Sequence, residues 1–232
     1  MKKRKKNWDK AGIVLLIAIA TSLSSCGSKT LDKQPSASYP TNSTTTTVAQ
    51  NSNTATITDS VKFKLDSGAD AFSLKPKDNG AKFVDKNDKE LARLTVDANQ
   101  KVKIKDASDK VLGYVVKKEG YWKIEDANQT KELFILRHQS DGDYKLEDGT
   151  NTQIYRIKAR SDGFEIETPQ KQSLYKVKAK EGKVSLKNAS EKTVLYTKAK
   201  VLPIVVACFG FDKLSREQQA ALAYAVNLSG GQ

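Results

Sequence analysis

The sequence has few of the side chains on which most catalytic and metal sites depend. It contains one histidine, His138, and two cysteines, Cys26 and Cys208, among 232 residues. A nucleophile–base pair or a soft metal site needs more such groups, and Cys208 lies in the apolar run 205–209. We therefore expect no enzymatic activity, no catalytic residues, no metal and no cofactor. An enzyme with an unrecognised site remains the open alternative.

The N-terminus combines a basic start with a short apolar stretch. Six basic residues precede the apolar stretch 11–23, which ends in Leu23-Ser24-Ser25-Cys26. The stretch is too short to cross about 30 Å of hydrocarbon, which needs roughly 20 apolar residues, so it indicates a secretory signal. Its ending resembles the bacterial lipobox. The resemblance implies cleavage before Cys26 and attachment of a lipid such as palmitate to its thiol, with an uncleaved anchor or an ordinary signal peptide as alternatives.

On this interpretation residues 1–25 are a lipoprotein signal peptide, and lipid on Cys26 attaches the protein to a membrane of the cell envelope. Gly27 follows Cys26. An Asp at this position would resemble an inner-membrane retention signal, and its absence favours outer-membrane delivery if the cell has two membranes. Loss of residues 1–25 lowers the net charge from +13 to about +8. With Cys26 modified, Cys208 has no disulfide partner, so the core alone must hold the fold.

Residues 26–60 are rich in Ser, Thr, Asn and Gln. Such a segment has too little apolar surface to offset the entropy of ordering, and we expect a disordered tether. The folded domain is expected at 61–230. Secretion and the absence of a nucleic-acid-binding signature argue against a nucleic-acid partner.

The expected domain is built from a repeat of about twenty residues. Six units lie between residues 79 and 200, and each opens with a turn dipeptide such as Glu119-Gly120 or Glu181-Gly182. Each unit continues with two short alternating strands, such as 102–104 and 112–116. Period-two alternation with one apolar face predicts antiparallel hairpins with one buried face. Segments 61–65 and 71–74 are candidates for one more hairpin.

A meander of this length must protect its edges, so the sequence predicts a mainly β fold, a closed antiparallel barrel of about twelve strands. Ser215 and Gln218 predict a capping box, and the apolar segment 220–226 follows, with Gly230 ending the helix. This helix has no polar face beyond its first turn, and the interior of a wide barrel would bury it on all sides.

The segment FDKLSREQQAALA at 211–223 resembles the end of the tubby C-terminal domain, in which Pro-Leu-Ser and a Gln-Ala pair begin the central helix. Lys213 stands where that ending has Pro. The chain is therefore similar to the tubby-like barrel superfamily, which includes LURP-one-related proteins and phospholipid scramblases. The resemblance implies a β-barrel closed around a C-terminal helix over residues 61–228. Some of these domains bind phosphoinositide headgroups through basic residues, which do not map onto this chain one by one.

The best candidate contacts are two rows of cationic side chains on strand faces. Alternate residues of a strand point the same way, so each row shares one face. The six residues are Arg156, Lys158, Arg160, Lys176, Lys178 and Lys180. They are candidates for contact with anionic phospholipid, or they serve solubility only. Glu165 and Glu167 lie between the rows in sequence and are expected to be cross-strand partners of lysines.

We expect a lipid-anchored envelope lipoprotein that acts as a non-enzymatic binding or scaffolding module. The alternative is anionic phospholipid binding, or lipid movement by a scramblase-like barrel. The sequence does not identify a protein partner.

Overall fold

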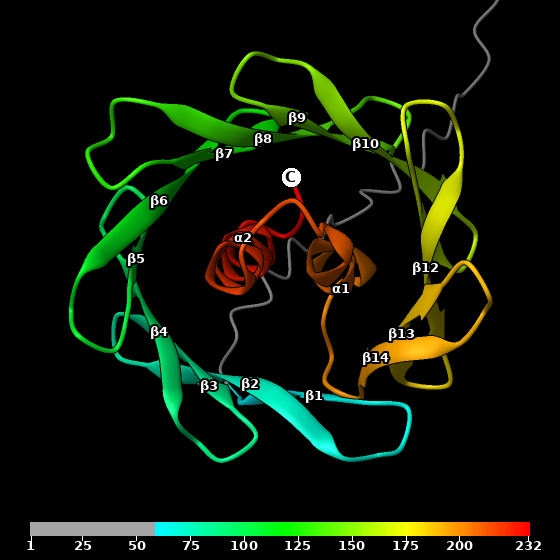
Figure 1. The fold of residues 1–232 in the computed structure, drawn as a ribbon, viewed down its shortest axis with the longest axis horizontal. Coiled ribbons are helices and arrows are strands. Elements are labelled where there is room, and N and C mark those ends of the chain that lie inside the picture. Colours follow the sequence, from blue (N-terminus) through cyan, green and yellow to red (C-terminus); the bar gives the residue numbers. More distant parts are fainter. Residues whose placement is uncertain (1–58) are drawn as a thin grey trace, which may run out of the picture. The chain divides into compact units, whose positions relative to one another are not determined.

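The computed structural model describes residues 59–232, which form a closed antiparallel β-barrel around two helices (Figure 1). The expected fold class is confirmed, but the barrel has fourteen strands rather than about twelve. The two additional strands, β1 and β2, are the hairpin that precedes the six repeats. The strands are β1 (Val61–Lys64), β2 (Asp70–Lys77), β3 (Gly80–Asp85), β4 (Glu90–Val96), β5 (Val102–Lys105), β6 (Val111–Lys118), β7 (Tyr121–Glu125), β8 (Glu132–His138), β9 (Tyr144–Asp148), β10 (Gln153–Arg160), β11 (Gly163–Glu167), β12 (Ser173–Lys180), β13 (Lys183–Asn188) and β14 (Thr193–Thr197).

Each strand pairs with its neighbours in sequence, and β1 closes the barrel by pairing with β14. We call the end at which β1 begins the proximal end; the turns β2–β3, β4–β5, β6–β7, β8–β9, β10–β11 and β12–β13 also lie there. The turns β1–β2, β3–β4, β5–β6, β7–β8, β9–β10, β11–β12 and β13–β14 lie at the other end, the distal end. The described part of the chain therefore enters the barrel at its proximal end.

The distal turns show why the sequence repeats. In the β3–β4 turn, Asp85 Oδ1 accepts hydrogen bonds from the backbone N–H groups of Asn87 and Lys89 at 2.8 and 2.9 Å. Asp88 then adopts a positive φ of 64°, which acidic and amide side chains tolerate better than most. Asp106 forms the same pair of bonds in the β5–β6 turn, at 2.8 and 3.0 Å. The repeat is therefore a repeat of turn chemistry as much as of strand pattern.

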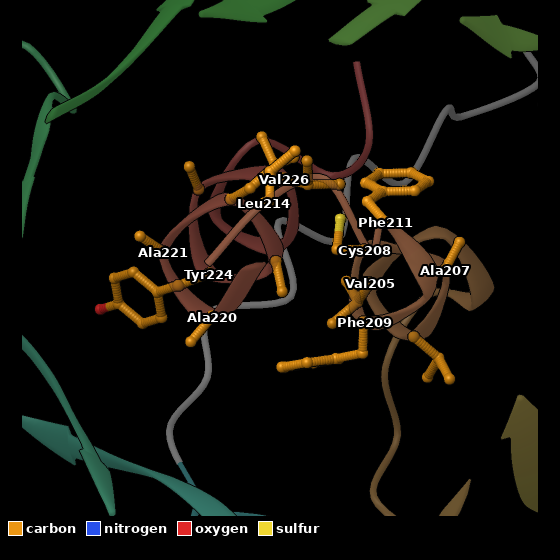
Figure 2. Packing of buried hydrophobic residues seen from close by; sticks show 14 of the residues in the cluster. Val205, Ala207, Cys208, Phe209, Phe211, Leu214, Ala220, Ala221, Tyr224 and Val226 are labelled. Atoms are coloured by element: carbon orange, nitrogen blue, oxygen red, sulfur yellow. The ribbon is translucent and has the colours of Figure 1, made fainter. Parts of the chain in front are cut away.

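The barrel interior is occupied by the C-terminal segment. It comprises α1 (Pro203–Ala207), the 3₁₀ turn η1 (Cys208–Gly210) and α2 (Arg216–Leu228). The side chains on both helices point into the space between them and toward the barrel wall (Figure 2). Phe211, Leu222 and Val226 are completely buried, and each such side chain contributes about 1.5–3 kcal/mol by leaving water.

Local sequence signals set the ends of α2. Ser215 caps the helix by accepting from the Gln218 backbone N–H, and the Gln218 side chain accepts from the Ser215 N–H at 2.9 Å. The predicted capping box is thus confirmed. At the other end Gly230 has a φ of 67°, and the Gly231 N–H donates to the carbonyl of Val226 at 2.9 Å. The burial expected for this helix is also confirmed, because residues 219–227 are all buried.

Among residues 59–232, no helix is both long enough and apolar enough to cross a membrane. The expected signal peptide at 1–25, the lipidation site Cys26 and the tether as far as residue 58 lie outside the described residues.

Candidate functional site

The two predicted cationic rows lie on strands that are not neighbours, and only Arg160, Lys176 and Lys178 line a common cavity of about 360 Å³, together with Asp162 and Glu165. Strand β11 lies between β10 and β12, so that Glu165 is paired with Lys158 on one side and Lys176 on the other. Arg156 likewise lies opposite Glu167. The two rows are therefore separated by a row of carboxylates on the same outward face of the barrel.

Each of the six predicted cations has a carboxylate partner. Arg160 contacts Glu165 at 2.8 Å, and Lys176 contacts Glu191 at 2.5 Å. The remaining pairs are Arg156–Glu167 at 4.0 Å, Lys158–Asp143, Lys178–Asp162 at 3.4 Å and Lys180–Glu181 at 3.4 Å. Glu165 and Glu167 are thus cross-strand partners of cations, but their ion pairs are with Arg160 and Arg156 rather than with the expected lysines.

The ion pairs differ in how far their side chains are exposed to water. Burial is the largest single influence on the pKa of Asp143 and raises it, but hydrogen bonds from Lys158 and the Ala159 N–H together outweigh burial and hold the pKa below its usual range. The Lys180–Glu181 pair, by contrast, is 81% exposed on both sides. A fully hydrated pair of this kind adds almost nothing to the fold, and Lys180 remains available to another anion.

Lys180 belongs to a second cluster, which the sequence did not reveal. A cavity of about 400 Å³ at the proximal end lies between the β12–β13 turn and the segment that follows β14. Its four lysines are Lys180, Lys183, Lys198 and Lys200. We call this cavity the basic groove. Glu181 is its one acidic lining residue among the described residues.

Three lysines of the basic groove are electrostatically uncompensated. No carboxylate of residues 59–232 lies within 4.0 Å of the ammonium groups of Lys183, Lys198 or Lys200, and all three residues are exposed. Lys183 rests over the ring of Tyr196, with its Nζ 5.2 Å from the ring centroid. The ring orients Lys183 without neutralising it, so the groove presents a concentrated positive charge.

The sequence did not predict that the lysines of the basic groove lie close together in space. Lys180 and Lys183 flank the turn Glu181-Gly182, whereas Lys198 and Lys200 follow the last strand. They come together because the chain turns inward after β14 to begin α1. Two basic pairs, each at a strand end, were the only signal in the sequence.

Four ammonium groups on flexible stems can hold a phosphate- or carboxylate-bearing anion, with an affinity that salt weakens. His138 is half-buried, with its ring centroid 4.7 Å from that of Tyr144. Cys208 is fully buried, and burial raises the pKa of its thiol. Within residues 59–232, no group of three His, Cys, Asp or Glu side chains is placed to hold a metal ion.

No family model and no curated protein matches this chain. A similar solved structure is an X-ray structure of a protein from Arabidopsis thaliana, which is 10% identical and has a TM-score of 0.37. The similarity covers 65% of this chain and 87% of the plant protein.

Proposed function

We propose that this protein is a lipid-anchored, non-enzymatic binding module of a bacterial cell envelope and that its basic groove holds an anionic partner. The single observation that carries the proposal is the cluster of Lys183, Lys198 and Lys200, which lack described carboxylate partners and line one cavity. The helices fill the barrel interior, so binding is left to the outer surface and the ends.

The position of the groove supports a role near the membrane. The groove and the start of β1 lie at the same end of the barrel, so lipid on Cys26 would tether the protein by the end that carries the free lysines. The anionic headgroups of a membrane surface attract such clusters by about 1 kcal/mol per basic residue. Anionic phospholipid is therefore the second candidate partner, beside an acidic envelope protein.

Kinship with the tubby-like barrels is part of this proposal. It is supported by the fourteen-stranded barrel, by the buried C-terminal helix and by the sequence at 211–223. Lipid movement of the scramblase kind has weaker support, since α1 and α2 occupy the interior through which a headgroup would pass.

The test uses residues 59–232, because the barrel closes on itself and supplies its own core. This fragment is sedimented with phosphatidylcholine vesicles that contain or lack phosphatidylglycerol, and with envelope membranes. Binding to the phosphatidylglycerol vesicles supports the lipid partner, and binding to envelope membranes alone supports a protein partner. Binding to neither overturns the proposal.

A matched pair of variants separates the groove from overall charge. Replacing Lys183, Lys198 and Lys200 by Glu should abolish salt-sensitive binding. The control replaces Lys86, Lys171 and Lys192 by Glu, which changes the net charge equally but in distal turns. If the control loses as much binding as the groove variant, the groove is not the site.

Lipid attachment is tested by mass spectrometry of the mature N-terminus. A lipid-modified Cys26 at the first position is expected. An unmodified Cys26 thiol would refute the anchor and leave the groove hypothesis intact.

A further inference from the structure

The barrel wall is interrupted where β1 meets β14. These strands are paired at the single position Lys64–Tyr196, whereas the other neighbouring strands are paired at four to six positions. At the distal end, the edge of β14 that faces β1 therefore has no strand partner from Thr193 to Leu195. A cavity of about 260 Å³, here called the seam cavity, opens at this point.

The rim of the seam cavity is unusually apolar. Leu65 and Val194 line it and are 44% and 41% exposed; within residues 59–232 they are the exposed large hydrophobic side chains. Leu65 occupies the turn position at which Asp85, Asp106 and Asn188 accept backbone hydrogen bonds in other distal turns. An apolar residue here gives up that capping interaction and remains 44% exposed, which the fold alone does not explain.

The floor of the seam cavity belongs to the hydrophobic core. Phe72, Leu195 and Phe209 line it, and each is at most 8% exposed. Gly210 lies beside it, where an added Cβ would stand 2.9 Å from Ile166 Cδ1 and 3.3 Å from Leu186 Cδ1. The cavity thus leads from an apolar rim to tightly packed apolar side chains.

The mouth carries one charge of each sign. The Arg216 guanidinium lies 5.3 Å from the centroid of the Phe72 ring and donates to Gln219 Oε1 at 2.9 Å. Asp212 accepts a 2.9 Å hydrogen bond from the Tyr175 hydroxyl. Neither charge has an ion-pair partner within 4.0 Å among the described residues, although both line the same cavity.

We propose that the seam cavity binds a small zwitterion with an apolar side chain, of the class of a free α-amino acid with the size of leucine or phenylalanine. Arg216 receives the carboxylate, Asp212 receives the ammonium group, and the apolar side chain lies in the cavity against Phe72 and Leu195. The size is appropriate, because a cavity of about 150 Å³ suffices to bind benzene and drug-sized ligands need about 300 Å³ or more. The charge pair selects against molecules that carry one charge only.

Isothermal titration of the barrel with L-phenylalanine and L-leucine tests the proposal. Both should bind saturably. The deaminated acid 3-phenylpropanoate and the decarboxylated amine 2-phenylethylamine should each bind about tenfold more weakly or worse, because each leaves one charge of the mouth without its partner. Equal binding of either analogue, or no saturable binding of the amino acids, overturns the proposal.

Variants locate the site. Arg216→Gln and Asp212→Asn should each weaken phenylalanine binding about tenfold, and Arg216→Lys should restore part of the loss because it keeps the positive charge. The controls Lys213→Gln and Asp66→Asn remove nearby exposed charges that do not line the cavity and should leave binding unchanged. Circular dichroism confirms that each variant is folded. Binding that persists in Arg216→Gln and Asp212→Asn would show that another site is responsible.

Discussion

The hydroxyl of Tyr144 donates a 2.6 Å hydrogen bond to the carbonyl oxygen of Gly231, 87 positions further along the chain. Tyr144 begins β9 at the proximal end, and Gly231 follows α2, so this bond fastens the end of the interior helix to the barrel wall. Trp122 provides a second tie through its Nε1, which donates to Ser229 Oγ at 3.1 Å. The helix is therefore held by polar bonds as well as by apolar contacts.

Tyr144→Phe should lower the free energy of unfolding by about 1–3 kcal/mol, because it leaves the buried Gly231 carbonyl without its donor. Urea unfolding at pH 7 measures the loss. Tyr121→Phe is the control, since the Tyr121 ring packs against Arg137 and no described hydrogen bond uses its hydroxyl. An equal loss in both variants would contradict the role assigned to the Tyr144 bond.

The same hydroxyl predicts sensitivity to alkaline pH. Burial, with a smaller effect of Cys208, raises the pKa of Tyr144 to about 12, whereas an unfolded tyrosine ionises near pH 10. A raised pKa in the folded state means that the stabilisation is complete below about pH 10 and is lost as the pH rises toward 12. Urea midpoints between pH 8 and pH 11 should fall more steeply in the wild type than in Tyr144→Phe. Parallel curves would contradict the prediction.

Glu147 should stabilise the barrel at neutral pH. Burial raises its pKa, but hydrogen bonds from Lys145 and Arg137, at 2.8 and 2.6 Å, outweigh this effect and hold the pKa below its usual range. The contribution is therefore present above about pH 4.3 and is lost as the pH falls below that value. Glu147→Gln should cost about 1–3 kcal/mol at pH 7, and the difference from wild type should shrink in acid.

Glu181→Gln is the matched control for Glu147, because Glu181 forms an ion pair whose two side chains are 81% exposed. Its unfolding free energy should equal that of the wild type within about 0.5 kcal/mol. The interpretation of Glu147 fails if both substitutions cost the same.

Cys208 reports on access to the barrel interior. It is fully buried beside α2, and burial raises the pKa of its thiol, so both access and thiolate formation are suppressed. In the Cys26→Ser variant, a thiol reagent at pH 8 should react only at the rate of unfolding and should react at once in concentrated urea. Rapid reaction without urea would show that the interior is open.

The sequence predicted the structural features that depend on residues close together in the chain. Ser215 and Gln218 are three positions apart and cap α2 as expected, and the hairpin repeat predicted β3 to β14. The number of about twelve strands counted the six repeats alone. The candidate hairpin at 61–65 and 71–74, which was left out of that count, is the hairpin of β1 and β2.

The candidate site depends on distances that sequence spacing does not encode. The alternation of strand faces correctly placed Arg156 and Lys158 on the outside of β10. It did not predict that β11, with its carboxylates, lies between the two cationic rows. The basic groove depends on the inward path of residues 198–201 after β14. The seam cavity similarly requires the short pairing of β1 with β14, which no local pattern reports.

Hydrogen exchange of the α2 backbone amides tests the central claim, namely that the helices fill the barrel and leave binding to its outer surface and its ends. The amides of residues 220–226 should be among the slowest in the protein and should exchange only through global unfolding, with the free energy that urea unfolding gives. Exchange of these amides ahead of those in the barrel strands would show that the helix leaves the interior readily, and would contradict the account.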